Sequence, residues 1–283
     1  MYRKDFVYLV QGQRERIAGY QHLADRERAD ALFLTYDHPL DGAIYFPRST
    51  WAEGRNRLLE AARQQGPYRY YIFSDDDAAF DRGEWQTLED GLLAVRPAIG
   101  VPVVRRTRDT PIRGLSHQVF MANDEQVMAF HDNVVADGLV LPYQTQFDDL
   151  HWWATCTVQQ TLIQAFYFGS AMQFNHVVVR NECDLRYDDP VEGRETYPDL
   201  VRAWLQTQLR ALPVDRTRRV GRNKPLALWT TLRFHLGSLG PRPRSHRLPP
   251  ARVTAQLCPD ALLMAQYRAA SSPDGPDGEA ARP

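Results

Sequence analysis

Short apolar segments alternate with helical segments along the first hundred residues, and this alternation constrains the fold more than any other feature of the sequence. Strands that alternate with helices through short connections form a mainly parallel sheet with helices on its faces. Ligands of such sheets bind beyond the carboxyl ends of the strands. The predicted strands are 6–10, 31–36, 43–46, 68–73 and 98–104, and the predicted helices are 16–24, 51–65 and 84–95.

The helix over residues 51–65 has the clearest boundaries. Ser49 or Thr50 can cap its N-terminus, and Glu53 follows Thr50 by three residues, as in a capping box. Gly66, which is followed by a proline, ends the helix. Both ends of this element are therefore predicted from local sequence alone.

The pattern becomes α+β after residue 104. Residues 105–114 are polar and arginine-rich and predict a loop, whereas 119–141 predict a pair of short strands. Further segments predict helices over 150–168, 197–212 and 225–236 and a strand over 171–180. We expect a main domain over 1–196, a helical C-terminal extension over 197–240, and a Pro/Arg-rich, largely disordered tail over 241–283.

Charge and composition narrow the function classes. The chain has 34 Lys and Arg against 35 Asp and Glu, so no net field draws it to nucleic acid. Lys4 and Lys224 are the only lysines in the sequence. Any phosphate must therefore be held by arginine, by backbone N–H groups or by a metal ion.

The cysteine pattern and the hydropathy predict a cytoplasmic protein without an integral membrane segment. The three cysteines form no C-x-x-C pair, and they are too few and too scattered for a disulfide framework. The apolar run near the N-terminus ends at Gln11, which is far short of a signal peptide or a membrane span of ~20 residues.

Three consecutive aspartates, Asp75, Asp76 and Asp77, follow the predicted strand 68–73 after a single serine. Carboxylates held this close repel one another and require solvent or a cation. Mg²⁺ or Mn²⁺ bound by one or two carboxylates together with substrate phosphates meets this requirement. The alternative is a solvated acidic turn that caps the following helix.

The order of these features resembles the GT-A glycosyltransferases, in which a helix bearing Arg-Asn precedes a strand that ends in a D-x-D motif. Here the pair is Arg55-Asn56, and the motif is Asp75-x-Asp77. The resemblance covers roughly residues 5 to 104 and implies a Rossmann-like GT-A fold, a mainly parallel mixed sheet flanked by helices.

The resemblance also implies the roles of individual residues. Asp77 is expected to be the direct metal ligand, and Asp75 is expected to contact the ribose or to reach the metal through water, with Asp76 between them. Arg55 and Asn56 are expected to face the nucleotide. Asp37 follows the second predicted strand, where the family often reads the base or ribose, although Asp37-His38-Pro39 also fits a simple turn.

The activity implied is metal-dependent transfer of a sugar, with Mn²⁺ or Mg²⁺, from a nucleotide-diphosphate sugar to an unidentified small-molecule, glycan or peptide acceptor. UDP is the expected nucleotide. Inverting transfer needs a carboxylate base. Asp149 or Asp148, at the start of the predicted helix 150–168, is the candidate, and the alternative is that they only favour the helix N-terminus. His151, His176 and His235 are candidate third metal ligands, and the alternative is that each has a structural role.

Other classes of protein also fit an acidic motif after a strand. A phosphotransfer enzyme of the haloacid-dehalogenase type has the motif on its first strand, whereas here it lies 75 residues into the chain. A nucleotidyltransferase has a Gly-rich phosphate loop after its first strand, and Gln11-Gly12-Gln13-Arg14 is only a short match. A non-catalytic protein that binds nucleotide sugars is the remaining alternative.

Overall fold

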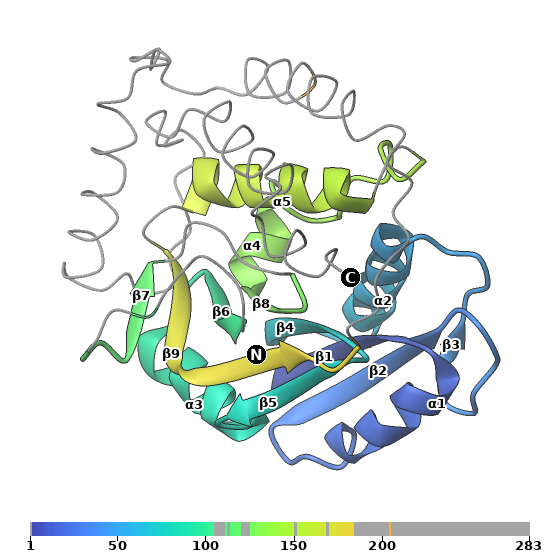
Figure 1. The fold of residues 1–283 in the computed structure, drawn as a ribbon, viewed down its shortest axis with the longest axis horizontal. Coiled ribbons are helices and arrows are strands. Elements are labelled where there is room, and N and C mark those ends of the chain that lie inside the picture. The colour runs from blue at the N-terminus through green and yellow to red at the C-terminus, as the bar shows by residue number, and fades with distance from the viewer. Residues whose placement is uncertain are drawn as a thin grey trace, which may run out of the picture.

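The computed structural model describes residues 2–104, 111, 114–119, 125–149, 152–167, 170–183 and 204. These residues form a nine-stranded sheet with helices on both faces (Figure 1). The strands are β1 (Lys4–Gly12), β2 (Ala29–Thr35), β3 (Ile44–Tyr45), β4 (Tyr68–Asp75), β5 (Ala78–Arg82), β6 (Ile99–Val104), β7 (His117–Val119), β8 (Val127–His131) and β9 (Ala171–Asn181). The helices are α1 (Arg14–Ile17), the 3₁₀ helix η1 (Ala18–Leu23), α2 (Trp51–Gln65), α3 (Trp85–Val95), α4 (Asp132–Asp137) and α5 (Trp152–Tyr167).

The sheet is mixed, with strand order β3-β2-β1-β4-β8-β6-β9-β5, and β7 pairs with β9. Strands β3, β2, β1 and β4 run parallel, β8 is antiparallel to both β4 and β6, and β6 is parallel to β9. The predicted α/β class, with helices flanking a mixed sheet, is confirmed. Because β1, β2 and β4 are parallel, their carboxyl ends share one edge of the sheet.

Different helices cover the two faces of the sheet. α2, α4 and α5 pack on one face, whereas α1, η1 and α3 pack on the other (Figure 1). Strand β1 contributes to both cores by alternation, since Val7 and Leu9 join the first and Phe6, Tyr8 and Val10 join the second. This burial on both faces explains why β1 is an almost continuous apolar run.

Several segments differ from the sequence prediction: the predicted helix 16–24 is α1 followed by the 3₁₀ helix η1, and β7 was not predicted. Residues 132–137 were expected to belong to a strand, but they form α4, because the His131 side chain accepts a hydrogen bond from the Asn133 N–H and Gly138 ends the helix in the left-handed region. Strand β5 was not predicted. It has no apolar run of its own and forms by antiparallel pairing with β9.

The expected helices over 197–212 and 225–236 and the expected tail lie outside the described residues, apart from Trp204, whose ring packs on Phe147 at 5.8 Å. Among the helices of the described ranges, none has both the length and the apolar character needed to cross a membrane.

Candidate active site

The aspartate triplet lies at the carboxyl end of β4, as predicted, beside the end of β1. Gln11 is the register partner of Asp75, and the Asp75 N–H donates to the Gln126 carbonyl at 3.0 Å. The chain turns at Asp76 and Asp77, so the three carboxylates have three different sets of neighbours. Each is held by a different part of the fold.

Asp75 contacts the first turns of α2. Its Oδ1 accepts a hydrogen bond from Arg55 Nη2 at 2.8 Å and another from Trp51 Nε1 at 3.1 Å. The Asp75 side chain is 27% exposed, whereas that of Arg55 is fully buried. The carboxylate is thus bonded to a buried cation, and part of its surface is still accessible to solvent.

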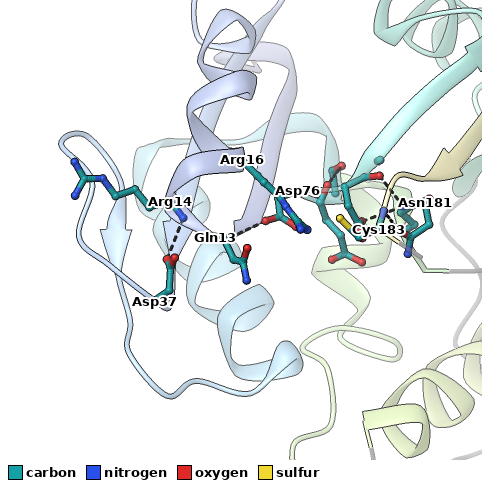
Figure 2. A network of polar contacts seen from close by, with 12 residues as sticks. Gln13, Arg14, Arg16, Asp37, Asp76, Asn181 and Cys183 are labelled. Carbon is teal, nitrogen blue, oxygen red and sulfur yellow. Dashed lines mark hydrogen bonds and ion pairs between the residues drawn. The ribbon is translucent and has the colours of Figure 1, made fainter. Parts of the chain in front are cut away.

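Asp76 contacts the junction between β1 and α1. Its Oδ2 accepts a hydrogen bond from the Gln13 N–H at 2.6 Å, and Arg16 Nη1 lies 4.0 Å from Oδ1 (Figure 2). A Cβ on Gly12 would lie 2.1 Å from Asp76 Cγ, so only glycine leaves room for this side chain. Burial raises the pKa of Asp76 to about 6, and the Asp77 charge adds to the rise although the Gln13 N–H and Arg16 oppose it.

Asp77 contacts the start of β8. Its Oδ1 accepts a hydrogen bond from Gln126 Nε2 at 3.0 Å, and its carbonyl accepts one from the Glu182 N–H at 2.8 Å. Burial raises the pKa of Asp77, and the charge of Asp75 adds to the rise. Asp76 and Asp77 both line a cavity of about 450 Å³, together with Arg16, Tyr20, Trp85 and Glu182. Holding two negative charges here is costly, and a bound cation would offset that cost.

Asp37, which follows β2, contacts the same β1–α1 junction. Its Oδ1 accepts hydrogen bonds from the Arg14 N–H at 3.0 Å and from the His38 N–H at 2.7 Å (Figure 2). Slight burial raises the pKa of Asp37, but these hydrogen bonds outweigh it and lower the pKa overall. Asp37 and Asp76 therefore accept from adjacent N–H groups, those of Arg14 and Gln13.

Asn56, the second residue of the Arg-Asn pair, is bound to the backbone of Tyr143. Its Nδ2 donates to the Tyr143 carbonyl at 2.9 Å, and its Oδ1 accepts from the Tyr143 N–H at 2.7 Å. Both polar ends of the amide are thereby used. Contact of Arg55 or Asn56 with a nucleotide stays a prediction.

Asp148 is brought to the N-terminus of α2. Its Oδ2 accepts a hydrogen bond from the Thr50 hydroxyl, and its Oδ1 accepts one from the Thr155 hydroxyl at 2.8 Å. Burial raises the pKa of Asp148, although both hydroxyls oppose the rise. Asp149, the next residue of the same turn, is exposed. Asp148 is thus bonded to Thr50, and Asp75 is bonded to Trp51, the next residue along the chain.

The donor set of the triplet fits Mg²⁺ or Mn²⁺, since both ions prefer carboxylate oxygens. In the described part of the chain, no three His, Cys, Asp or Glu side chains are grouped so as to hold a metal ion by themselves. An ion at Asp75 and Asp77 would need further oxygens from phosphate or water, as Mg²⁺ usually does. His176 is exposed and borders a different cavity, beside α3, and its Nδ1 lies 3.1 Å from the Ser116 carbonyl. His151 and His235 lie outside the described residues.

Sequence reasoning did not place Gly12, Gln13 and Gln126 beside the triplet, and it considered the first two only as a short match to a phosphate loop. Gly12 and Gln13 follow the first apolar run, and a parallel pairing of this run with 68–73 would have placed them beside the triplet. Gln126 has no such signal, because its contact with Asp77 depends on the antiparallel pairing of β8 with β4.

No protein-family model matches the chain, and no curated protein matches it. Among solved structures, S. aureus TarS 1–349 in complex with UDP-GlcNAc is similar to it, with a TM-score of 0.44 and 10% identity over 70% of this chain and 66% of that one. A second TarS structure gives a TM-score of 0.47 and 10% identity over 70% of this chain and 39% of that one. The structure of A197 from STIV is also similar, with a TM-score of 0.40 and 9% identity over 63% of this chain and 86% of that one.

The chain thus spans less than two thirds of the length of either TarS chain. At these TM-scores and identities, the likeness carries no information about what this chain binds.

Proposed function

We propose that the protein is a metal-dependent glycosyltransferase that moves a sugar from a nucleotide-diphosphate sugar, UDP-linked, to an acceptor. One observation carries the proposal: the two acidic motifs of the sequence meet at the N-terminus of α2. Asp148 accepts a hydrogen bond from Thr50, and Asp75 accepts one from Trp51. Such a pairing suits glycosyl transfer, because the leaving diphosphate must be stabilised and, in an inverting enzyme, a carboxylate takes a proton from the acceptor.

Asp75 and Asp77 would hold Mn²⁺ or Mg²⁺ through carboxylate oxygens. When bound, the ion supplies positive charge against the diphosphate. This fits the scarcity of lysine. Lys4 lies at the opposite end of β1, where its Nζ donates to the Ala29 carbonyl at 2.8 Å, and Lys224 lies outside the described residues. Arg16, whose Nη1 lies 4.0 Å from Asp76 Oδ1, is a partly exposed cation beside the triplet, whereas Arg55 is buried against Asp75.

Asp149 is the better candidate for the base. Both oxygens of Asp148 accept hydrogen bonds from threonine hydroxyls, so this carboxylate serves to join the acidic turn to α2. Asp149 follows it directly and is exposed, so an acceptor hydroxyl can reach it. Asp37 would read the base or ribose through the oxygen that the Arg14 and His38 N–H groups leave open.

The test is a thermal-shift panel of UDP, GDP, CMP and ADP, each with and without Mn²⁺. At about 100 times its Kd a ligand adds ~2.7 kcal/mol to the free energy of unfolding. For a chain of this size, that raises Tm by several degrees. We expect UDP to do so only with Mn²⁺.

Asp77→Asn should remove this UDP–Mn²⁺ shift while keeping the ligand-free Tm within a few degrees of the wild type. It should also lower hydrolysis of UDP-sugars by about 100-fold or more, since the charge it withdraws supplies several kcal/mol. Asp81→Asn, which neutralises a nearby carboxylate paired with Arg180, is the matched control. An unchanged UDP–Mn²⁺ shift in Asp77→Asn would refute the site, and no response to any nucleotide would refute the proposed function.

A further inference from the structure

We infer that Arg55 and Asn56 are positioning residues: Arg55 orients Asp75, Asn56 fixes the ring that supports Arg55, and neither touches the donor. The inference rests on the proposed function and gives the Arg-Asn pair a different role from the one implied by the resemblance. It follows from how the two side chains are buried and bonded.

The Arg55 guanidinium is enclosed by protein. Its exposed fraction is 0%, and its Nη1 donates to the Tyr143 hydroxyl at 3.1 Å. Its Nη2 donates both to Asp75 Oδ1 and to the Glu125 carbonyl, each at 2.8 Å. A nucleotide could reach this group only if the first turns of α2 or the Tyr143 segment moved away.

Three aromatic rings surround the cation. The Arg55 Cζ atom lies 4.0 Å from the centroid of the Trp51 ring and 5.6 Å from those of Phe73 and Tyr143. Aromatic faces attract a cation, and their exclusion of water strengthens its interaction with a carboxylate. The enclosure thus directs the positive charge at Asp75.

Asp75 receives two of these fixed donors on the same oxygen. Arg55 Nη2 and Trp51 Nε1 both bond to Oδ1. No residue in the described part of the chain donates a hydrogen bond to Oδ2, so this is the oxygen that the carboxylate offers to a ligand.

Asn56 acts one step further away. Its amide accepts from and donates to the backbone of Tyr143, and the Tyr143 ring packs edge-on against Trp51 at 5.1 Å and accepts from Arg55 through its hydroxyl. The order of support runs from Asn56 through Tyr143 and Arg55 to Asp75. Groups that orient a ligating side chain in this way change metal affinity by about 10–100-fold when they are removed.

A double-mutant cycle separates positioning from direct contact. We would measure the Kd for UDP–Mn²⁺ and the unfolding transition of the wild type, Arg55→Met, Asp75→Asn and the double variant. If Arg55 acts only through Asp75, Arg55→Met weakens binding by about tenfold, and the double variant binds no more weakly than Asp75→Asn alone. Additive losses would show that Arg55 contacts the nucleotide and would overturn the inference.

Further variants test whether weaker binding results from loss of folding or from the loss of any arginine on α2. Trp51→Phe removes the second donor to Asp75 Oδ1 and keeps an aromatic ring beside Arg55, so it should also weaken binding and should have no further effect in Asp75→Asn. Asn56→Ala should weaken binding by a smaller factor than Arg55→Met. Arg57→Met removes an exposed arginine of α2, which is paired with Glu60. It should change neither the Kd for UDP–Mn²⁺ nor the unfolding transition.

The unfolding data distinguish this inference from the proposed function. A wild type that binds no nucleotide, but in which the Arg55 and Asp75 substitutions are non-additive in unfolding, would refute the proposed function and keep the pairing of the two side chains. Additive effects on unfolding would overturn the pairing whether or not nucleotide binds.

Discussion

His131 shows how burial sets the pH response of a single residue. Its Nδ1 accepts a hydrogen bond from the Asn133 N–H at 3.2 Å, and its ring packs edge-on against Tyr70 at 5.0 Å. Burial lowers the pKa of His131 to about 4, and the charge of Arg69 contributes to the lowering. The neutral ring is thus the form that caps α4.

We predict that protonation of His131 destabilises the fold on mild acidification. The unfolded chain binds the proton below pH ~6.5 but the folded protein only near pH 4, so this contribution to the free energy of unfolding is present above 6.5 and is lost as the pH falls towards 4. The loss should total roughly 2–3 kcal/mol. Urea unfolding between pH 4.5 and 7.5 measures it as the difference between wild type and His131→Gln, whose amide oxygen can still cap α4.

His22→Gln is the control, because this histidine is exposed and its Nδ1 lies 2.9 Å from the Gly19 carbonyl. The difference between wild type and His22→Gln should depend on pH less than the difference between wild type and His131→Gln, because the His22 side chain is exposed. An equal pH dependence in both comparisons would show that the burial of His131 is not the cause.

The N-terminus of helix α2 is bonded to both acidic motifs. Thr50 caps the helix by accepting a hydrogen bond from the Glu53 N–H at 3.2 Å, and the Glu53 side chain accepts one from the Thr50 N–H at 2.9 Å. The same Thr50 hydroxyl donates to Asp148. One side chain thus begins the helix and fastens the acidic turn to it.

We predict that Thr50→Ala lowers the free energy of unfolding by roughly 1–3 kcal/mol, since it removes a helix cap and a hydrogen bond to a carboxylate. It should also lower transfer activity, because the turn that carries Asp149 loses its attachment. Thr50→Ser keeps both hydrogen bonds and should behave like the wild type in both measurements. Loss of stability without loss of activity would mean that the attachment does not position Asp149.

Glu89 connects a helix on one face of the sheet to the sheet itself. It lies on α3, is 1% exposed, and accepts a hydrogen bond from the Tyr8 hydroxyl of β1 at 2.5 Å. Arg26 and Arg28, from the segment before β2, lie 3.0 and 3.2 Å from its two oxygens. One carboxylate therefore links helix α3, strand β1 and the segment that precedes β2.

We predict that Glu89→Ala lowers the free energy of unfolding by about 3 kcal/mol. This is the lower end of the usual cost of breaking a buried ion pair, because both arginines can still reach solvent. Asp90→Ala removes a neighbouring carboxylate that also pairs with Arg28 but is 58% exposed, and it should cost less than ~1 kcal/mol. Equal effects of the two substitutions in urea unfolding would contradict the assignment.

Local signals were enough to predict the elements whose boundaries depend on neighbouring residues. Thr50, Glu53 and Gly66 mark both ends of α2 through contacts within a few residues, and these boundaries are confirmed. The apolar run of β1 and the aromatic run of β4 predicted buried strands, and the parallel arrangement placed Asp75 at the carboxyl edge. Burial of both faces requires such runs wherever the sheet forms its core.

The orientation of the acidic side chains and the partners that hold them depend on contacts between residues far apart in the sequence. Asp76 bonds to Gln13 across 63 residues, and Asp148 bonds to Thr50 across 98. β5 and α4 depended likewise on pairing with β9 and on a cap from the end of β8. These contacts arise from strand register and helix packing, which bring together residues that no local periodicity relates.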